Sequence, residues 1–197
     1  MPRRSAAAVS ATRTEVLDVA VHRASIDGLE GLTIGRLADE LSMSKSGLFG
    51  LFGSKEELQL ATFEAAVDHF TREVWEPVAH TEPGLPRLLA LVDRWLSYHQ
   101  RRVMPGGCFV TTATIEFDAR PGPLREAVTR ARRRMHAALE ADVRVAIAAG
   151  DLAASTRPAD VAFALYGLAS AASTAIQLDK PGAHPRARRS MRALLGA

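Results

Sequence analysis

The chain has 197 residues, a formal net charge of +3 and an isoelectric point near 9.5. Its 47% hydrophobic and 24% charged residues are those of an ordinary globular protein with one or two domains. A single cysteine excludes an intramolecular disulfide framework and fits a reducing compartment. The N-terminal stretch lacks the apolar core of a signal peptide, and the most apolar run, 161–176, is shorter than a membrane span. We therefore expect a cytoplasmic protein that makes no membrane contact.

The surplus of positive charge suggests an anionic partner, but this charge is not concentrated near the N-terminus. The first 58 residues hold seven basic side chains (Arg3, Arg4, Arg13, Arg23, Arg36, Lys45, Lys55) and eight acidic ones (Glu15, Asp18, Asp27, Glu30, Asp39, Glu40, Glu56, Glu57). The extra arginines lie at 130–134 and 186–189. Arg3 and Arg4 could form an arm that reaches DNA or belong to a solvated terminus, and the sequence leaves both open. Global charge is thus weak support for DNA binding.

The first helix is predicted to begin at Thr12, because Thr12 and Glu15 have the spacing of a capping box. Leu17, Ala20, Val21 and Ala24 follow at the spacing of one apolar helix face. Gly28 is predicted to end this helix in the left-handed conformation that glycine adopts at little cost.

Residues 33–58 predict two short helices joined by a tight turn, followed by a third helix. Thr33 can cap the first helix, whose apolar stripe is Ile34, Leu37, Ala38 and Leu41. Ser44 can cap the second helix, which is expected to end near Gly50, and Ser54 with Glu57 forms a capping box for the third. A pair of short helices in this arrangement is typical of proteins that place the second helix in a DNA major groove.

The runs 31–38, 43–49 and 52–58 together resemble the DNA-binding domain of TetR-type transcriptional regulators, over about residues 11–70 with the helix-turn-helix at about 33–52. The chain departs from the family pattern at 49–52, Phe-Gly-Leu-Phe, where Tyr-x-His-Phe is common. The missing phenol and imidazole remove two phosphate contacts that the resemblance would imply.

The second helix displays small polar and basic side chains that suit DNA. Lysine can contact phosphate or guanine, serine can bond to either, and glycine lets the backbone approach closely. The competing interpretation is a polar turn that faces solvent. The resemblance supports DNA contact by Thr33, Arg36, Ser44, Lys45, Ser46, Gly47, Phe49 and Lys55.

The remainder of the chain reads as further helices. The third helix is predicted to run to about Trp75, where Pro77 would end it. Further helices are predicted over 85–99, 109–117, 124–146 and 159–177, with a last one after Pro185. Residues 109–117 would also suit a strand, but no second strand is available to pair with them. The sequence therefore predicts an all-α protein of about nine helices, with a second domain over 71–197.

The resemblance implies a small-molecule pocket among the middle helices and a dimer interface on the last two. Helical spacing alone would fit an ordinary core and intramolecular packing equally well. The residues proposed for the effector are Trp95, Tyr98, Met104, Cys108, Phe109, Thr112, Glu116, Phe163 and Tyr166. The residues proposed for the dimer are Leu165, Gly167, Leu168, Ala172, Met191 and Leu195. Cys108 could be a redox switch, although a small residue lining a core or pocket is the more common role.

Catalysis is not expected. His99, Cys108 and Glu116 have no motif that would bring them together, the six histidines lack paired metal-ligand spacing, and there is no glycine-rich phosphate loop. We expect no metal and no cofactor. The sequence favours a homodimeric repressor that binds a palindromic operator in double-stranded DNA and is released by a small apolar or aromatic effector. The alternative is a helical, dimeric small-molecule-binding protein whose DNA binding is weakened or lost.

Overall fold

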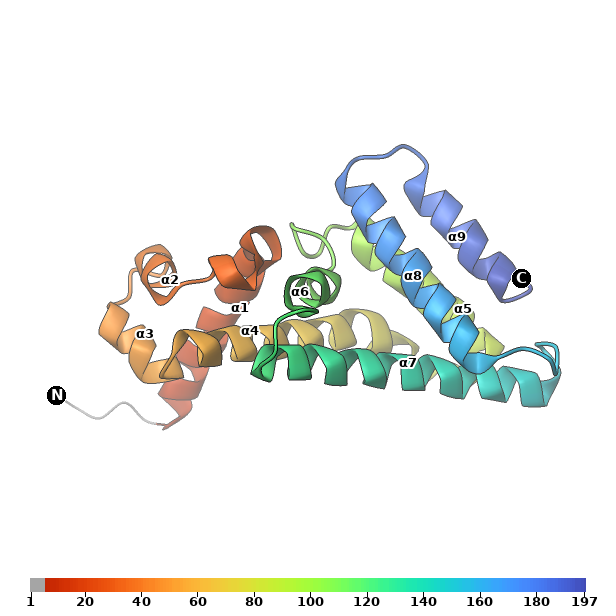
Figure 1. The fold of residues 1–197 in the computed structure, drawn as a ribbon, viewed down its shortest axis with the longest axis horizontal. Helices are drawn as coiled ribbons and strands as arrows, with labels where there is room; N and C mark the ends of the chain where they lie inside the picture. Colours follow the sequence, from red (N-terminus) through yellow and green to blue (C-terminus); the bar gives the residue numbers. More distant parts are fainter. Residues whose placement is uncertain (1–5) are drawn as a thin grey trace. The chain divides into compact units, whose positions relative to one another are not determined.

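The computed structural model describes residues 6–197, and this part of the chain contains nine α-helices and no strand (Figure 1). The all-α prediction is therefore confirmed. The helices are α1 (Ala6–Gly31), α2 (Ile34–Glu40), α3 (Lys45–Phe52), α4 (Lys55–Phe70), α5 (Leu85–Gln100), α6 (Phe109–Phe117), α7 (Pro123–Ala149), α8 (Pro158–Gln177) and α9 (Ala183–Leu194). Arg3 and Arg4, considered above as a DNA-binding arm, lie outside the described residues.

The described residues fall into two compact units. The first, called the head here, comprises the chain up to Asp68 together with Phe109–Val128. The second, called the body, comprises His69–Cys108 and Thr129–Ala197. Because α6 clusters with the head, the compact units are not two consecutive segments, and the domain division at residue 70 stays a prediction.

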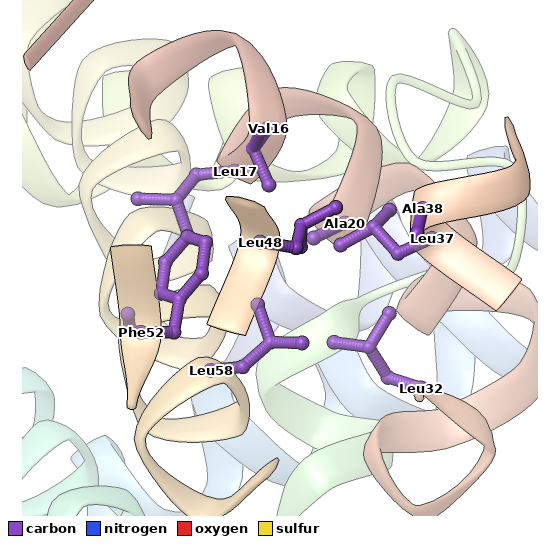
Figure 2. Close-up of a cluster of buried hydrophobic side chains, with 10 residues drawn as sticks. Val16, Leu17, Ala20, Leu32, Leu37, Ala38, Leu48, Phe52 and Leu58 are labelled. Carbon is purple, nitrogen blue, oxygen red and sulfur yellow. The ribbon is translucent and has the colours of Figure 1, made fainter. Parts of the chain in front are cut away.

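The head is built around a small apolar core to which α1, α2, α3 and α4 each contribute (Figure 2). Leu37, Leu48 and Leu58 are at most 1% exposed, and each comes from a different helix. Neither α2 nor α3 is long enough to be stable alone, so this shared burial holds the pair in place. The core consists of Val16, Leu17, Ala20, Leu32, Leu37, Ala38, Leu48, Phe52, Leu58 and Ala61.

The body packs α5 against α8 and α9, and the C-terminal part of α7 closes on the start of α5. Gly84 is the N-cap residue of α5 and has no side chain that could cap the helix. Its amide donates to Oδ1 of Asp142 on α7 at 3.1 Å. Nε of Arg87 donates to Oδ2 of the same carboxylate at 2.9 Å. Asp142 is only 2% exposed, so its charge is compensated by this arginine and by the amide.

Helix α1 begins at Ala6, so the prediction of a start at Thr12 was wrong. Thr14 Oγ1 donates to the Ser10 carbonyl at 3.2 Å, a bond to the preceding turn that is typical of a helix interior. The alanine-rich residues before Thr12 favour helix and carry α1 further toward the N-terminus. Gly28 does interrupt the helix, with φ 75° and ψ 166°, but a further helical turn follows it.

Most other helix ends lie within two residues of the sequence prediction, but α4 ends at Phe70 and not near Trp75, and α9 begins at Ala183, before Pro185. Residues 71–75 form a π-helical turn after α4, and residues 76–78 form a 3₁₀ turn that contains Pro77. Helix α7 ends at Ala149, and Gly150 follows with φ 83°. Residues 109–117 are helical, as predicted, and form α6.

Candidate nucleic-acid interface

Side-chain caps define where both helices of the helix-turn-helix begin. Thr33 has extended φ/ψ, and its Oγ1 accepts from the amide of Arg36 at 3.3 Å. Ser44 is also extended, and its Oγ accepts from the amide of Gly47 at 3.0 Å. Ser42 has φ 53°, and the Met43 amide donates to the Ala38 carbonyl at 2.9 Å, which keeps the intervening turn tight. The two helices are therefore joined by a short, hydrogen-bonded turn.

Helix α3 has two distinct faces. Leu48 and Phe52 are buried in the head core, one helical turn apart. Lys45, Ser46 and Phe49 are exposed on another face, and Phe49 shows 56% of its surface to solvent. A helix with its apolar side anchored and a small polar side free is the form that enters a major groove.

Two glycines leave space beside these exposed side chains. A Cβ at Gly35 of α2 would lie 3.6 Å from Cε of Lys45, so the lysine stem lies over this glycine. A Cβ at Gly50 would meet nothing within 4 Å. Because these two positions carry no side chain, another molecule can approach the backbone beside the exposed face of α3 closely.

Most of the basic side chains of the head already contact acidic ones. Arg23 pairs with Glu40 at 2.9 Å, and Arg36 lies 3.8 Å from Asp27. Arg36 nevertheless keeps 70% of its side chain exposed, and exposed pairs of this kind contribute little to stability. Arg36 therefore stays available to a phosphate.

Lys55, one of the residues proposed above to contact DNA, already has a partner within the head. Its Nζ donates to the Glu30 carbonyl at 3.0 Å and to the Glu30 carboxylate at 3.3 Å. Its side chain is 44% exposed, so a phosphate would have to compete with Glu30 for the ammonium group. Among the described residues no carboxylate pairs with Lys45, which makes it the free cation of α3.

The residues proposed for the effector are divided between the two units. Trp95, Tyr98, Met104, Cys108, Phe163 and Tyr166 belong to the body, and Phe109, Thr112 and Glu116 belong to the head. Phe163 is 69% exposed, so it lines no buried space within the body. Glu116 accepts hydrogen bonds from two backbone amides of the head, a role that its position in the sequence did not reveal.

Inside the body, aromatic rings form a connected cluster around Trp95. Its ring centroid lies 5.7 Å from that of Phe70 and 6.4 Å from that of Tyr166. His136 lies 5.5 Å from Tyr166, and the Arg132 guanidinium lies 4.7 Å from the centre of the same ring. Arg132 and His136 are four residues apart on α7. The sequence-based set of effector residues contained neither of them, because nothing local to 130–136 indicates that this part of α7 meets Tyr166.

Several buried ring nitrogens in this part of the body lack a hydrogen-bond partner. They include Nε1 of Trp95, both ring nitrogens of His99 and Nε2 of His136. Trp95 and His99 are four residues apart on α5 and are 3% and 5% exposed. Burial lowers the pKa of His99 to about 4 and raises the pKa of Tyr98, so the imidazole and the phenol are both neutral near pH 7.

The last two helices contain both buried and exposed members of the residues proposed for the dimer. Leu165, Ala172, Met191 and Leu195 are buried within the body, whereas Gly167 is exposed and Leu168 is half-buried. The exposed side of α8, together with its C-cap residue, is a stripe defined by Phe163, Gly167, Ala171, Thr174 and Leu178. Within the described residues, α8 is also the one helix long and apolar enough to cross a membrane, although half-covered helices of globular proteins have the same properties. The stripe leaves an apolar surface without an intramolecular partner.

The anchored helix pair and the free face of α3 define this chain as a DNA-binding transcriptional regulator of the helix-turn-helix class. Residues 16–62 match the domain described as "Bacterial regulatory proteins, tetR family". Residues 84–191, more than half of the chain, match "Tetracyclin repressor-like, C-terminal domain". The chain belongs to the tetR family, whose members are generally non-enzymatic regulators.

Solved structures with the same fold extend over nearly the whole chain. A TetR transcriptional regulator from Chloroflexus aurantiacus has a TM-score of 0.87 at 23% identity, covering 95% of this chain and 96% of its own. A regulator from Saccharomonospora viridis in complex with choline has a TM-score of 0.80 at 20% identity, covering 95% and 96%. AibR, in complex with isovaleryl coenzyme A and operator DNA, has a TM-score of 0.75 at 19% identity, covering 91% and 95%. No curated protein matches the sequence.

Proposed function

We propose that this regulator binds a palindromic operator as a homodimer, in the cytoplasm, and releases it when a small apolar or aromatic effector binds. The observation that carries DNA contact is the exposed face of α3, where Lys45 and Ser46 are exposed while Leu48 is buried in the head core. AibR supports the two kinds of partner, since that protein is described in complex with isovaleryl coenzyme A and operator DNA.

A dimer follows from the geometry of double-stranded DNA and from the exposed stripe of α8. Two recognition helices must lie about 34–36 Å apart to enter successive major grooves on one face of the duplex. The stripe at Phe163, Gly167 and Leu178 has the small and apolar side chains that allow two helices to approach closely. We infer that α8 of one protomer packs on α8 of its partner, with α9 beside it.

The aromatic cluster around Trp95 supports an effector site in the body. Trp95 Nε1 can only donate, so a ligand there would carry a hydrogen-bond acceptor such as a carbonyl, ether or carboxylate oxygen. The neutral His99 can donate one bond and accept another, and Arg132 adds positive charge beside Tyr166. The effector class we propose is an aromatic or apolar molecule that carries at least one acceptor oxygen.

The test is selection of DNA by the wild-type protein from a random duplex pool, followed by measured binding of the enriched sequence. We expect an inverted repeat with half-sites one helical turn apart and a complex that contains two protomers. The alternative, a small-molecule-binding protein with decayed DNA binding, predicts no enriched sequence. Its basis is the absence of a phenol at Phe49 and of an imidazole at Leu51, and failure of the selection with a folded, dimeric protein would establish it.

A further inference from the structure

Glu116 of α6 caps a turn of helix that lies 86–87 residues earlier in the chain. After the break at Gly28, the amides of Leu29 and Glu30 begin a new helical turn and have no carbonyl of that turn to bond to. The Glu116 carboxylate accepts from both of them, Oε2 from Leu29 at 2.9 Å and Oε1 from Glu30 at 2.7 Å. The Glu116 side chain of α6 therefore acts as an N-cap for the last turn of α1.

Gly28 is the residue that makes room for this cap. Its φ of 75° lies in the region that favours glycine, and a Cβ there would be 3.0 Å from Oε1 and 3.1 Å from Oε2 of Glu116. Any other residue would thus be strained and would also press on the carboxylate. The pair Gly28 and Glu116 forms one structural feature, even though the two residues are far apart in sequence.

The same turn is also held through its carbonyl groups by α4. Nε2 of Gln59, which is 4% exposed, donates to the Leu29 carbonyl at 2.6 Å. Lys55 donates to the Glu30 carbonyl at 3.0 Å, and Arg120, just after α6, pairs with the Glu30 carboxylate at 3.4 Å. Leu29 and Glu30 are therefore held both by α4 and by the residues of and just after α6.

The clamped turn leads directly into the DNA-reading helices. The Leu32 amide donates to the Leu29 carbonyl at 3.1 Å, and the Leu32 side chain is 1% exposed in the head core. The next residue, Thr33, is the N-cap of α2. A shift of the Leu29 turn would move Leu32 and Thr33 with it, and so change the start of α2.

We propose that Glu116 is a positioning residue for operator recognition: by capping the Leu29 turn it sets the position of α2 and therefore the angle at which α3 meets DNA. The inference rests on the proposed function for the existence of an operator. Glu116 is not a DNA contact, and the sequence-based assignment of it to the effector is replaced by this role.

The test compares Glu116→Gln with Glu64→Gln, a matched change at an exposed glutamate of α4 in the same unit. Glutamine offers one acceptor oxygen, so one of the two charge-assisted bonds is lost. We expect Glu116→Gln to lower affinity for the enriched duplex by about tenfold, since one such bond is worth roughly that factor. Affinity for a scrambled duplex and the slope of affinity against salt should not change, because no phosphate contact is removed. Glu64→Gln should leave all of these values at the wild-type level.

Hydrogen exchange measures the cap without DNA. In Glu116→Gln, the amides of residues 29–30 should exchange faster, while those of α3 keep their wild-type protection. Faster exchange with unchanged affinity for the enriched duplex would overturn the positioning role, and so would an equal loss on enriched and scrambled duplexes. Unchanged exchange would overturn the cap itself.

A second variant and the exchange experiment keep the proposal testable if Glu116→Gln does not fold or if no DNA sequence is enriched. Glu116→Asp retains both oxygens but shortens the side chain by one methylene, so it should give a loss of the same kind if Glu116→Gln does not fold. If the wild-type protein enriches no sequence, the proposed function fails, and the exchange experiment still decides whether Glu116 caps the turn.

Discussion

Lys45 is the side chain on which DNA binding depends most at the scale of single residues. It is the one cation of α3, and within the described residues it has no acidic partner, unlike Lys55 with Glu30 and Arg23 with Glu40. Its charge is therefore not offset before DNA arrives. A free cation on the recognition helix gains the full benefit of releasing counterions from the duplex.

Lys45→Ala should weaken binding to the enriched duplex by about 1–3 kcal/mol. If Lys45 contacts a phosphate, the slope of log affinity against log salt falls by about one unit and every DNA sequence is affected alike. If it contacts a base, the slope stays near the wild-type value and sequence preference relaxes at one position. Lys180→Ala, an exposed lysine after α8, is the matched control. Wild-type affinity in Lys45→Ala would remove this residue from the interface.

The buried His99 leads to a prediction of how the free energy of unfolding depends on pH. Its pKa is lowered to about 4 by burial, against about 6.5 in an unfolded chain. The unfolded state therefore binds the proton more readily, and stability falls as the pH is lowered from 6.5 toward 4. Between pH 7 and pH 5 this one group should cost about 2 kcal/mol of unfolding free energy.

Urea unfolding of the wild type and of His99→Leu, at pH 7 and at pH 5, isolates this contribution. Other groups titrate in both proteins, so the difference between the two pH dependences belongs to His99. We expect the variant to lose less stability on acidification than the wild type. Parallel losses would show that the imidazole is not held neutral in the folded protein.

At the scale of helices, the sequence identified every helix because the caps and breaks are local. Thr33 and Ser44 each cap their own helix, because the side-chain oxygen accepts from the amide three residues later. These hydrogen bonds depend on neighbouring residues alone. The start of α1 was missed because Thr12 and Glu15 have a capping spacing that an alanine-rich helix simply runs through. A capping motif therefore predicts a helix start reliably only when the residues before it do not themselves favour helix.

Contacts across long stretches of sequence were beyond this kind of reasoning. Nothing near Glu116 indicates that its carboxylate meets amides at 29 and 30, and Gly28 was predicted only as a helix end. Likewise, Lys55 was proposed only as a DNA contact, and the sequence did not reveal its hydrogen bond to Glu30 in the folded head. The residues that are exposed on α3 could be predicted because the helix period alone places them opposite the buried Leu48.

The exposed stripe of α8 gives a prediction at this scale. Gly167 is exposed and a Cβ there meets nothing within 4 Å, so Gly167→Leu should leave the monomer fold intact. If two α8 helices pack together, the added side chain overfills the contact and weakens the dimer by roughly 1–3 kcal/mol. Sedimentation velocity across a dilution series would measure the change.

Ala148→Leu, at an exposed position of α7, serves as the matched control and should dimerise as the wild type does. Thermal unfolding at high protein concentration should confirm that both variants are folded. A Gly167→Leu protein with an undiminished dimer would place the interface away from this stripe.

At the scale of the whole molecule, two of the helices run from one compact unit into the other. Helices α4 and α7 each begin in one compact unit and end in the other, because the division falls after Asp68 and after Val128. Effector binding in the body and DNA binding in the head can therefore be coupled through continuous secondary structure. Thermodynamics then requires that the coupling be equal in both directions.

The last prediction uses this equality. A compound found by its effect on tryptophan fluorescence should lower affinity for the enriched duplex by some factor, and the duplex should lower affinity for that compound by the same factor. Trp75→Phe leaves Trp95 as the reporter, since the chain has two tryptophans.

Two variants should separate the two kinds of binding. Tyr166→Ala should lower affinity for the compound but spare binding to DNA in its absence, because Tyr166 lies beside Trp95 in the body. Phe49→Ala should show the opposite pattern, because Phe49 is exposed on α3. A compound that binds at this site with no effect on DNA affinity would disprove release by an effector there.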